Sequence, residues 1–392
     1  MKTPAPSASS APRGDIIVHV LGRTDVGRTR EHNEDAFLVA DLTTGAVSEQ
    51  AEAVTYALGP RGALFMVADG LGGAAAGEIA SGMAVDVVLQ EMQRTWVNAP
   101  TSDPDTFAHA LKRACDVANT RIYEYAMKNP DHRGLGTTAT IAGLLGDTLY
   151  LVQVGDSRAY IVRDGVAQQI TKDQSLMQRL IEAGELTPEE AEQSERKNII
   201  LQALGPEPTV KIDLTHQGVR RGDMLVLCTD GLSGQVRKDE IARVVQDERD
   251  LSTAGQTLID RANENGGPDN ITVVIVQLEG EGLAPPSRGD IVGHSVFELQ
   301  HATPTTPRTP LRRISEKVRM VGAGAEQPTK EPAAPVRAHS SRWNQLLLLA
   351  LATVLVIALV AFLYVRVRGA VSGTPAQPVA PAETSAGSTV PQ

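Results

Sequence analysis

The sequence predicts an α+β domain in which largely antiparallel sheets are covered by helices, and three observations support this class. The chain has 392 residues, 42% hydrophobic and 21% charged, which is the balance of a globular protein and excludes a wholly disordered or fibrous one. Short β-branched runs alternate with amphipathic stretches between residues 15 and 280. The strand-like runs come in adjacent groups separated by long helices, which favours antiparallel pairing over a regular parallel βαβ array.

The expected elements follow from local pattern. Strand-like runs cover residues 16–20, 63–68, 139–144, 148–154, 159–163, 224–228 and 271–278. Helical periodicity covers residues 78–93, 107–128, 175–183, 239–246 and 253–263. Residues 187–190 (TPEE) combine an N-cap, a proline at the first helical position and a capping box, and therefore predict the start of a further helix.

Composition excludes several classes of function. Two cysteines cannot supply a disulfide scaffold or a structural zinc site, and no two of the eight histidines have metal-ligand spacing. Residues 1–280 carry 26 basic and 40 acidic side chains, whereas residues 281–392 carry 11 and 7. An acidic main domain argues against general nucleic-acid binding, and we expect no nucleic-acid partner.

The two flanks of this domain have different compositions. Residues 1–14 are rich in Pro, Ser and Ala and contain no apolar run, so we expect a disordered leader and not a signal peptide. Residues 281–342 hold eight prolines and few large apolar residues, which predicts a disordered Pro-rich linker. The Thr-Pro stretch at residues 303–310 favours a stiff spacer over a regulatory phosphorylation tract.

Residues 346–365 form an apolar run of 20 residues in which only Thr353 and Tyr364 are polar. As a helix this run would be about 30 Å long, the thickness of a bilayer's hydrocarbon core. Interface-type residues flank it: Trp343, Arg342, Arg366 and Arg368. We therefore predict a single transmembrane helix over residues 343–365, followed by a short tail over residues 366–392, and not a buried soluble helix.

Acidic residues stand at the ends of predicted strands, each beside glycine or in a tight turn: Asp69, Asp156, Asp230 and Asp269. Glycine lets the backbone approach closely and leaves its carbonyl free as a ligand. Earlier in the chain, Arg30, Glu34 and Asp35 add a guanidinium and two carboxylates.

These residue types point to metal-assisted hydrolysis. Carboxylate and carbonyl oxygens select Mg²⁺ or Mn²⁺. Two such ions about 3.5–4 Å apart can activate a bridging water and clamp a phosphoryl group. An arginine fork fits the phosphate oxygens. A single Asp-Gly after a strand is usually only a turn. The prediction of a metal pair held by carboxylates therefore depends on the joint occurrence of several such motifs in one chain.

Six segments, in this order, resemble the motifs of the protein phosphatase 2C family, the metal-dependent serine/threonine phosphatases. They are REHNED (30–35), DGLGG (69–73), GLGTTAT (134–140), GDSR (155–158), TDGLS (229–233) and GGPDNIT (266–272). The resemblance covers about residues 16–280 and implies a phosphatase domain over residues 15–280. It further implies a four-layer αββα sandwich of two antiparallel sheets flanked by helices, with a mobile flap at about residues 171–205.

The resemblance assigns metal ligands residue by residue. It implies that Asp69 bridges two metal ions and that Gly70 gives a backbone carbonyl to one of them. Asp230 and Asp269 would bind the other ion directly. Asp156, together with Asp230, would form a third-metal site, so the expected cofactors are two or three Mn²⁺ or Mg²⁺ ions.

Three further roles come from the same resemblance. Glu34 and Asp35 would hold metal-bound waters, and Arg30 would grip the substrate phosphate. The implied reaction is direct attack of a metal-activated water on phosphorus, without a phosphoenzyme.

Departures from the family pattern leave the general acid unassigned. Leu71 and Ala74 stand at positions where relatives often carry histidine, so a metal-bound water or the distant His32 are the candidates for leaving-group protonation. In the flap region, residues 173–175 (DQS) and 194–195 (SE) replace the Asp-His-Ser and His-Pro of many relatives.

Cys115 and Arg121 have the Cys-x5-Arg spacing of cysteine phosphatases. That chemistry needs a phosphate-cradling loop after the cysteine and a depressed thiol pKa. The segment contains no glycine, and Cys115 shares one helical face with Phe107 and Leu111. We therefore predict that Cys115 is a core residue.

These observations predict a protein phosphatase that hydrolyses phosphoserine and phosphothreonine. The alternative is a catalytically inactive, membrane-bound scaffold that binds phosphoproteins, and the presence of every metal-site aspartate argues against it. A purely structural membrane anchor explains none of the motifs.

The apolar run and the resemblance to membrane-anchored bacterial members add expectations about location and partners. We expect a monomeric, single-pass protein of the cell membrane, with its catalytic domain in the cytoplasm and its tail outside. Its partners would be phosphorylated proteins, including membrane Ser/Thr kinases.

Overall fold

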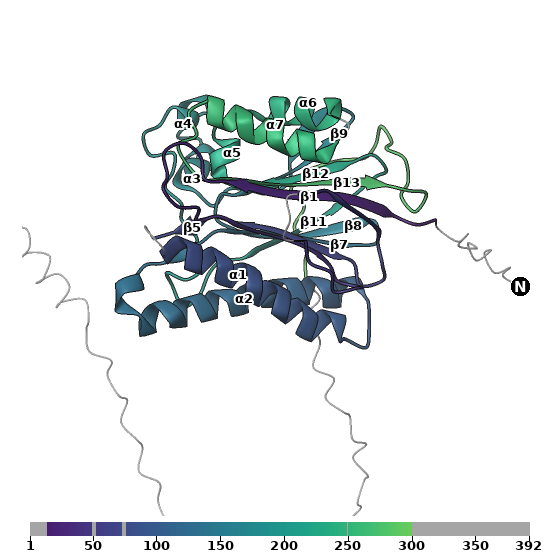
Figure 1. Ribbon diagram of the computed structural model, residues 1–392, viewed down its shortest axis with the longest axis horizontal. Coiled ribbons are helices and arrows are strands. Elements are labelled where there is room, and N and C mark those ends of the chain that lie inside the picture. Colours follow the sequence, from purple (N-terminus) through teal and green to yellow (C-terminus); the bar gives the residue numbers. More distant parts are fainter. Residues whose placement is uncertain (1–13, 49–51, 73–75, 249, 300–392) are drawn as a thin grey trace, which may run out of the picture. The chain divides into compact units, whose positions relative to one another are not determined.

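Two antiparallel sheets lie face to face, and helices cover both outer surfaces, in the computed structural model of residues 14–48, 52–72, 76–248 and 250–299 (Figure 1). This architecture confirms the predicted sandwich of two antiparallel sheets flanked by helices.

The first sheet has six strands in the spatial order β10 (Val166–Gln169), β9 (Arg158–Arg163), β12 (Met224–Cys228), β13 (Ile271–Glu279), β1 (Ile17–Asp25) and β3 (Val54–Ala57). The second has five, in the order β11 (Asp213–Gly218), β8 (Thr148–Val154), β7 (Ala139–Leu145), β4 (Ala63–Ala68) and β2 (Ala36–Asp41). A small two-stranded ladder joins β5 (Gly70–Leu71) to β6 (Gly136–Thr137).

Helices α1 (Ala76–Met92) and α2 (Pro104–Lys128) cover the second sheet, and α6 (Lys238–Asp247) and α7 (Leu251–Glu264) cover the first (Figure 1). The shorter helices are η1 (Gln93–Val97), η2 (Pro130–His132), α3 (Leu176–Glu182), α4 (Pro188–Glu192) and α5 (Asp230–Ser233). The predicted helix start at Thr187 is confirmed, because Thr187 and Glu190 form a reciprocal capping box at α4.

Strand β4 shows why the sandwich needs strands that are apolar on both faces. Successive side chains of a strand point to opposite sides. Phe65 and Val67 therefore enter the core between the sheets, whereas Leu64 and Met66 enter the core under α1 and α2. All six residues of β4 are buried. The continuous apolar run of the sequence is thus the pattern of a strand covered on both faces.

Residues 281–299 lie on the domain, within the range that we predicted to be linker. Thr215 of β11 forms a β-bridge with Val296, and the Phe297 N–H donates to the Leu214 carbonyl at 3.0 Å. The Phe297 ring meets Tyr150 edge-on at 5.3 Å. Pairing covers the open edge of β11, which would otherwise expose unpaired backbone groups. The prediction of a disordered linker was therefore wrong for residues 281–299. It relied on the proline content of residues 281–342, and the few apolar residues that contact the domain hardly change the overall composition.

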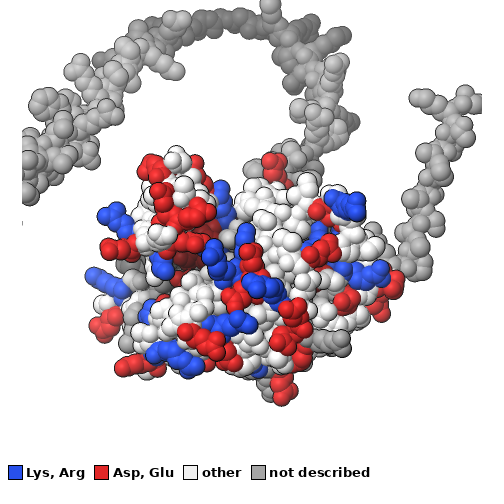
Figure 2. All heavy atoms as spheres, turned by 90° about the horizontal axis from the view of Figure 1, so that it is seen from above, with Lys and Arg blue, Asp and Glu red and all other residues white. Residues whose placement is uncertain are grey.

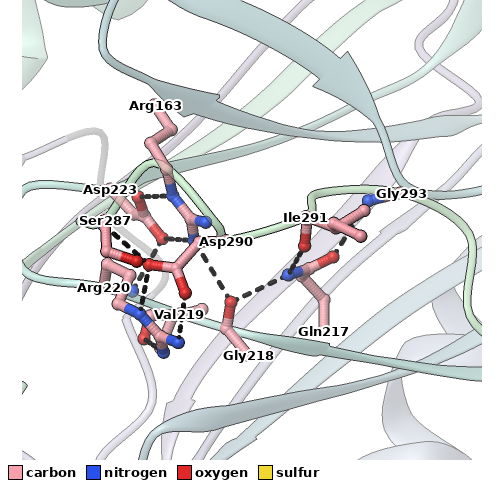
Figure 3. Close-up of polar contacts among 10 residues, drawn as sticks. All are labelled: Arg163, Gln217, Gly218, Val219, Arg220, Asp223, Ser287, Asp290, Ile291 and Gly293. Carbon is pink, nitrogen blue, oxygen red and sulfur yellow. Dashed lines mark hydrogen bonds and ion pairs between the residues drawn. The ribbon is translucent and has the colours of Figure 1, made fainter. Parts of the chain in front are cut away.

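Two linked ion pairs, one partly exposed and one buried, fasten the same segment (Figure 3). Arg220 grips the Asp290 carboxylate with two hydrogen bonds of 2.8 Å. Arg163 donates to both oxygens of Asp223 at 2.7 and 2.6 Å. The Asp223 side chain is 0% exposed and that of Arg163 8%. The Arg220 backbone N–H also donates to Asp223, so one buried carboxylate organises both arginines.

No helix in the described ranges has both the length and the apolar character needed to cross a membrane. The predicted span at residues 343–365 lies outside the described residues, as do the tail and the linker from residue 300 onward.

Replacing Asp223 by alanine would leave the Arg163 guanidinium buried and unpaired. We expect Asp223→Ala to lower the free energy of unfolding by about 3–5 kcal/mol. The control is Glu124→Ala, which breaks an exposed pair with Lys128 and should cost less than about 1 kcal/mol. Urea unfolding followed by circular dichroism measures both, and similar losses for the two variants would contradict this role of the buried pair.

Candidate metal centre

All the predicted site residues converge at one end of the sandwich, because the strand ends that carry them meet there. Asp69 follows β4, Asp156 follows β8, Asp230 opens α5 after β12, and Asp269 precedes β13. Gly70 begins β5, and residues 34–35 lead into β2. In Figure 1 the labels β5, α3 and α5 mark this end at the left. Figure 2 shows acidic side chains gathered at the same end of the upper face.

The backbone around Glu34 and Gly70 allows no side chain at residue 70. The Gly70 N–H donates to the Glu34 carbonyl at 3.1 Å. A Cβ on Gly70 would lie 2.3 Å from the Gly77 carbonyl oxygen and 2.4 Å from that of Glu34. The Glu34 carboxylate in turn lies against the Cα of Gly77, in the first turn of α1. Glycine at residues 70 and 77 thus brings a backbone turn and a carboxylate together.

Asn270 organises the segment that carries Glu34 and Asp35. Its side-chain oxygen accepts the Glu34 N–H at 2.8 Å, and its side-chain nitrogen donates to the carbonyls of Val26 and His32 at 2.9 Å. Asn270 belongs to the motif at residues 266–272, in which sequence reasoning gave it no role. The sequence feature that could have identified Asn270 as part of the site is its position next to Asp269. Its hydrogen bonds fasten the 26–34 loop beside the acidic cluster.

Asp35 lies in this cluster with a perturbed acidity. Desolvation by the surrounding protein raises the pKa of its carboxyl to about 7, although hydrogen bonds from Thr272 and Thr229 oppose the shift. The nearby charges of Asp230 and Asp269 raise the same pKa. The Thr229 hydroxyl donates to the Asp35 carboxylate at 2.8 Å and so fixes its orientation. Thr229 is a second residue to which sequence reasoning gave no role.

The other aspartates influence one another in the same way. Desolvation raises the pKa of Asp69 well above its ordinary value, and the charges of Asp35, Asp230, Asp156 and Asp269 raise it further. Desolvation and the charge of Asp230 raise the pKa of Asp156 to about 7. The pKa of Asp230 is also raised, first by desolvation and then by Asp269. The aspartates therefore form one electrostatically coupled cluster.

Arg30 faces this cluster from a more exposed position. Its Nη2 donates to the Asp269 Oδ2 at 2.8 Å, and its side chain is 47% exposed. Burial lowers the pKa of Arg30, but the ion pair with Asp269 and the charges of Glu34 and Asp69 outweigh burial and raise it. The guanidinium thus has both a carboxylate anchor and access to solvent, as a phosphate-binding arginine requires.

The donor set fits a hard divalent cation. In the parts of the chain that the structure describes, no three Asp, Glu, His or Cys side chains are arranged to hold a metal ion by themselves. However, Asp69 is close enough to Asp230 for the charge of Asp230 to raise its pKa, as do the charges of Asp35, Asp156 and Asp269. A divalent cation would relieve the repulsion among these carboxylates, and the Gly70 carbonyl and water would complete its shell.

Cys115 and His32 are the two remaining candidates for chemistry. Cys115 is 0% exposed on the inner face of α2, and burial raises the pKa of its thiol, which is the opposite of nucleophile activation. The prediction that Cys115 is a core residue is therefore confirmed. His32 is exposed, and its carbonyl, not its ring, serves the Asn270 clamp. Leu71 lies in β5, and Ala74 lies outside the described residues.

The fold and this centre together define the class of the protein: an αββα sandwich with a carboxylate centre at one end. The chain belongs to the protein phosphatase 2C family, whose model matches residues 44–272. It is 35% identical over 262 residues to the serine/threonine phosphatase Stp of Listeria monocytogenes, covering 67% of this chain and 96% of that protein. It is also 35% identical over 267 residues to PstP of Mycobacterium tuberculosis, covering 68% of this chain and 46% of that protein.

Solved structures agree with the sequence relatives. The Streptococcus agalactiae serine/threonine phosphatase aligns with a TM-score of 0.59 and 34% identity, over 67% of this chain and all of that one. The catalytic domain of PstP, solved in complex with two manganese ions, aligns with a TM-score of 0.54 and 33% identity, over 67% of this chain and 99% of that one.

The raised pKa values predict an unusual pH dependence of stability for the metal-free protein. Asp35 and Asp156 have folded pKa values of about 7, above an ordinary value of 3.8, so the folded state binds more protons than the unfolded state between these limits. Stability in EDTA should therefore fall as the pH rises from 4 to 7. We expect a loss of at least about 1.4 kcal/mol, the equivalent of one pKa unit.

Urea unfolding at pH 5 and pH 8, with EDTA and with MnCl₂, measures this effect. Asp69→Asn is the matched variant, because it removes one repelling charge without changing the size of the side chain. It should be at least as stable as the parental protein in EDTA and should gain less from Mn²⁺. A parental protein that is more stable at pH 8 than at pH 5 in EDTA would contradict the proposed coupling.

Proposed function

We propose that this protein is a Mn²⁺- or Mg²⁺-dependent phosphatase that hydrolyses phosphoserine and phosphothreonine in proteins. The observation that carries the proposal is the convergence of the aspartate cluster with Arg30 at one end of the sandwich. Membership of the protein phosphatase 2C family supports it, as do relatives that are themselves named serine/threonine phosphatases. The two manganese ions bound to PstP support the choice of cofactor.

The residues of the centre would have different roles in metal binding and catalysis. Asp69, Asp230, Asp269 and the Gly70 carbonyl would hold two divalent cations, and Asp156 together with Asp230 would hold a third. Bound cations would supply Lewis-acid stabilisation of developing charge and a more acidic water. The chain's own contribution is to keep the carboxylates oriented, as Thr229 does for Asp35.

Substrate phosphate would be held by Arg30. Its guanidinium projects from the Asp269 ion pair with part of its surface exposed, so it can donate to two phosphate oxygens at once. The Glu34 carboxylate, held against α1, lies close enough for its charge to act on Arg30. Leu71 carries no proton to give, so no side chain of the described site is assigned as the acid for the leaving group.

Hydrolysis of a phosphothreonine peptide tests the proposal. We expect activity with Mn²⁺, none with EDTA, and no loss after thiol alkylation, because both cysteines are buried. Arg30→Ala should raise KM for a small aryl phosphate about 10–100-fold, since a hydrogen bond to a charged group contributes about 1.5–3 kcal/mol. It should lower kcat less.

Arg30→Lys is the control in that experiment, because it keeps the charge but loses the planar fork. Its KM should lie between those of the parental protein and the alanine variant. A folded protein that binds phosphopeptide without hydrolysing it would instead favour the inactive scaffold. Inhibition by alkylation of Cys115 alone would overturn the assignment of water as the nucleophile.

We further propose that residues 343–365 anchor the protein in the cell membrane as a single span. The apolar run of residues 346–365 and its basic and aromatic flanks support this proposal. Residues 369–392 contain no Lys or Arg and only Glu383 as a charged side chain, which favours their translocation. The catalytic domain would then be cytoplasmic, and membrane Ser/Thr kinases would be among its phosphorylated partners.

Protease treatment of intact spheroplasts tests this orientation. The tail should be clipped, while the phosphatase domain should stay intact until the membrane is permeabilised. A tag at residue 392 and an antibody against the domain report the two events separately. Digestion of the domain in intact spheroplasts would refute both the orientation and the proposed kinase partners.

A further inference from the structure

Arg28 is a second exposed arginine on the loop that carries Arg30, and the metal centre gives it no role. The loop connects β1 to β2 at the end of the sandwich where the aspartates converge. Asn270 fastens both sides of the loop through the carbonyls of Val26 and His32. One residue separates the two arginines, so their Cα atoms are at most about 7 Å apart. Arg28 therefore lies beside the residue that would hold the substrate phosphate.

The backbone of residues 26–28 continues the pairing of β1 with β13 beyond the edge of the sheet. The Arg28 N–H donates to the Gly267 carbonyl at 2.8 Å. Gly27 has a φ of 81°, and a Cβ there would lie 2.2 Å from the Asp269 carbonyl oxygen. The main chain at Arg28 is thus fixed to the segment that carries Asp269.

Close packing also fixes the base of the Arg28 side chain. A Cβ on Gly267 would lie 2.8 Å from the Arg28 Cγ, so only glycine at residue 267 leaves room for the arginine stem. The Gly267 N–H donates to the Ala262 carbonyl at 3.0 Å, which ties this contact to the end of α7. Because the backbone and the stem are already ordered, less conformational entropy is lost when the guanidinium binds an anion.

The guanidinium of Arg28 differs from that of Arg30 in its partners. Arg30 is engaged with Asp269 at 2.8 Å. In the described part of the chain, the Arg28 guanidinium takes part in no hydrogen bond or ion pair, and the residue is exposed. Residues 1–280 carry 26 basic and 40 acidic side chains, so the surrounding domain is acidic. An unpaired cation beside the acidic cluster is therefore available to an anionic group of a substrate.

From these contacts we propose that Arg28 forms a second anion-binding subsite, which selects phosphopeptides with another anionic side chain two residues from the phosphorylated one. In an extended peptide, side chains two residues apart lie on one face, about 6.5–7 Å from each other, which matches the spacing of the Arg28 and Arg30 Cα atoms. A carboxylate and a phosphate share the chemistry that a guanidinium fork recognises. This proposal rests on the proposed function and deepens it, because it names the substrate class of the same site.

Hydrolysis of matched phosphothreonine peptides by the full chain in MnCl₂ tests the subsite. The peptides carry Glu, Ala or Lys two residues before or after the phosphothreonine. A further pair carries a non-hydrolysable phosphonate analogue of phosphothreonine there, which distinguishes a phosphate from a carboxylate. On at least one side, kcat/KM should be about three- to fivefold higher with Glu than with Ala, the range of an exposed charge pair. The phosphonate should give at least the same preference.

Variants of Arg28 identify the group responsible. Arg28→Ala should bring the ratio of kcat/KM for the Glu and Ala peptides to about 1, and Arg28→Glu should reverse the order of the Glu and Lys peptides. The matched control is Arg113→Ala, which removes an exposed arginine of α2 with the same change in net charge. It should keep the parental ratio. Added salt should reduce that ratio, because it screens exposed charges.

Binding separates this proposal from the proposed function. Fluorescence anisotropy uses the same peptides with the phosphothreonine replaced by its phosphonate analogue, so it needs no turnover. The Glu peptide should bind the parental protein about three- to fivefold more tightly than the Ala peptide, and Arg28→Ala should bind both equally.

The outcomes are distinct. Equal hydrolysis of the Glu and Ala peptides by the parental protein would overturn the subsite and leave the phosphatase standing, as would a preference that persists in Arg28→Ala. A preference in binding that depends on Arg28, in a protein that hydrolyses no phosphopeptide, would support the subsite and refute the phosphatase. Absence of both hydrolysis and charge-dependent binding would refute both.

Discussion

Repulsion among carboxylates that are withdrawn from water is the interaction on which the rest of the structure depends. Asp35, Asp69 and Asp156 all have raised pKa values, for which desolvation is the first cause and neighbouring aspartates the next. Such a cluster opposes folding unless cations or protons compensate it. Burial of apolar side chains in the core layers, of which β4 is an example, offsets this cost.

The scaffold holds the acids through backbone contacts more than through side-chain packing. Asn270 fastens the loop before Glu34, Thr138 accepts the Asp69 N–H, and Gln174 holds both backbone groups of Gly155. Each contact fixes the backbone of a turn, and the turn in turn sets the position of the carboxylate that it carries. This arrangement orients the carboxylates, and it explains why neutral residues beside the aspartates matter for the geometry of the centre.

Local sequence pattern predicted helix-covered antiparallel sheets and acidic residues at strand ends, and the family resemblance added the four-layer sandwich. Apolar runs such as residues 63–68 end in Asp-Gly, and the resemblance placed those ends together. The sequence pattern did not reveal β11, because this polar edge strand (DLTHQG) has no apolar alternation. It also missed the docking of Phe297 and the roles of Asn270 and Gln174. These depend on partners more than 15 residues away in the chain, which no local pattern reveals.

The central claim is that the aspartate cluster holds a pair of divalent cations. Electron paramagnetic resonance of the full chain, titrated with Mn²⁺, tests this most directly. The account predicts at least two bound ions per chain and a spin-coupled spectrum, because two ions about 3.5–4 Å apart interact magnetically. A spectrum of isolated mononuclear Mn²⁺ at every loading, or no binding at all, would contradict it.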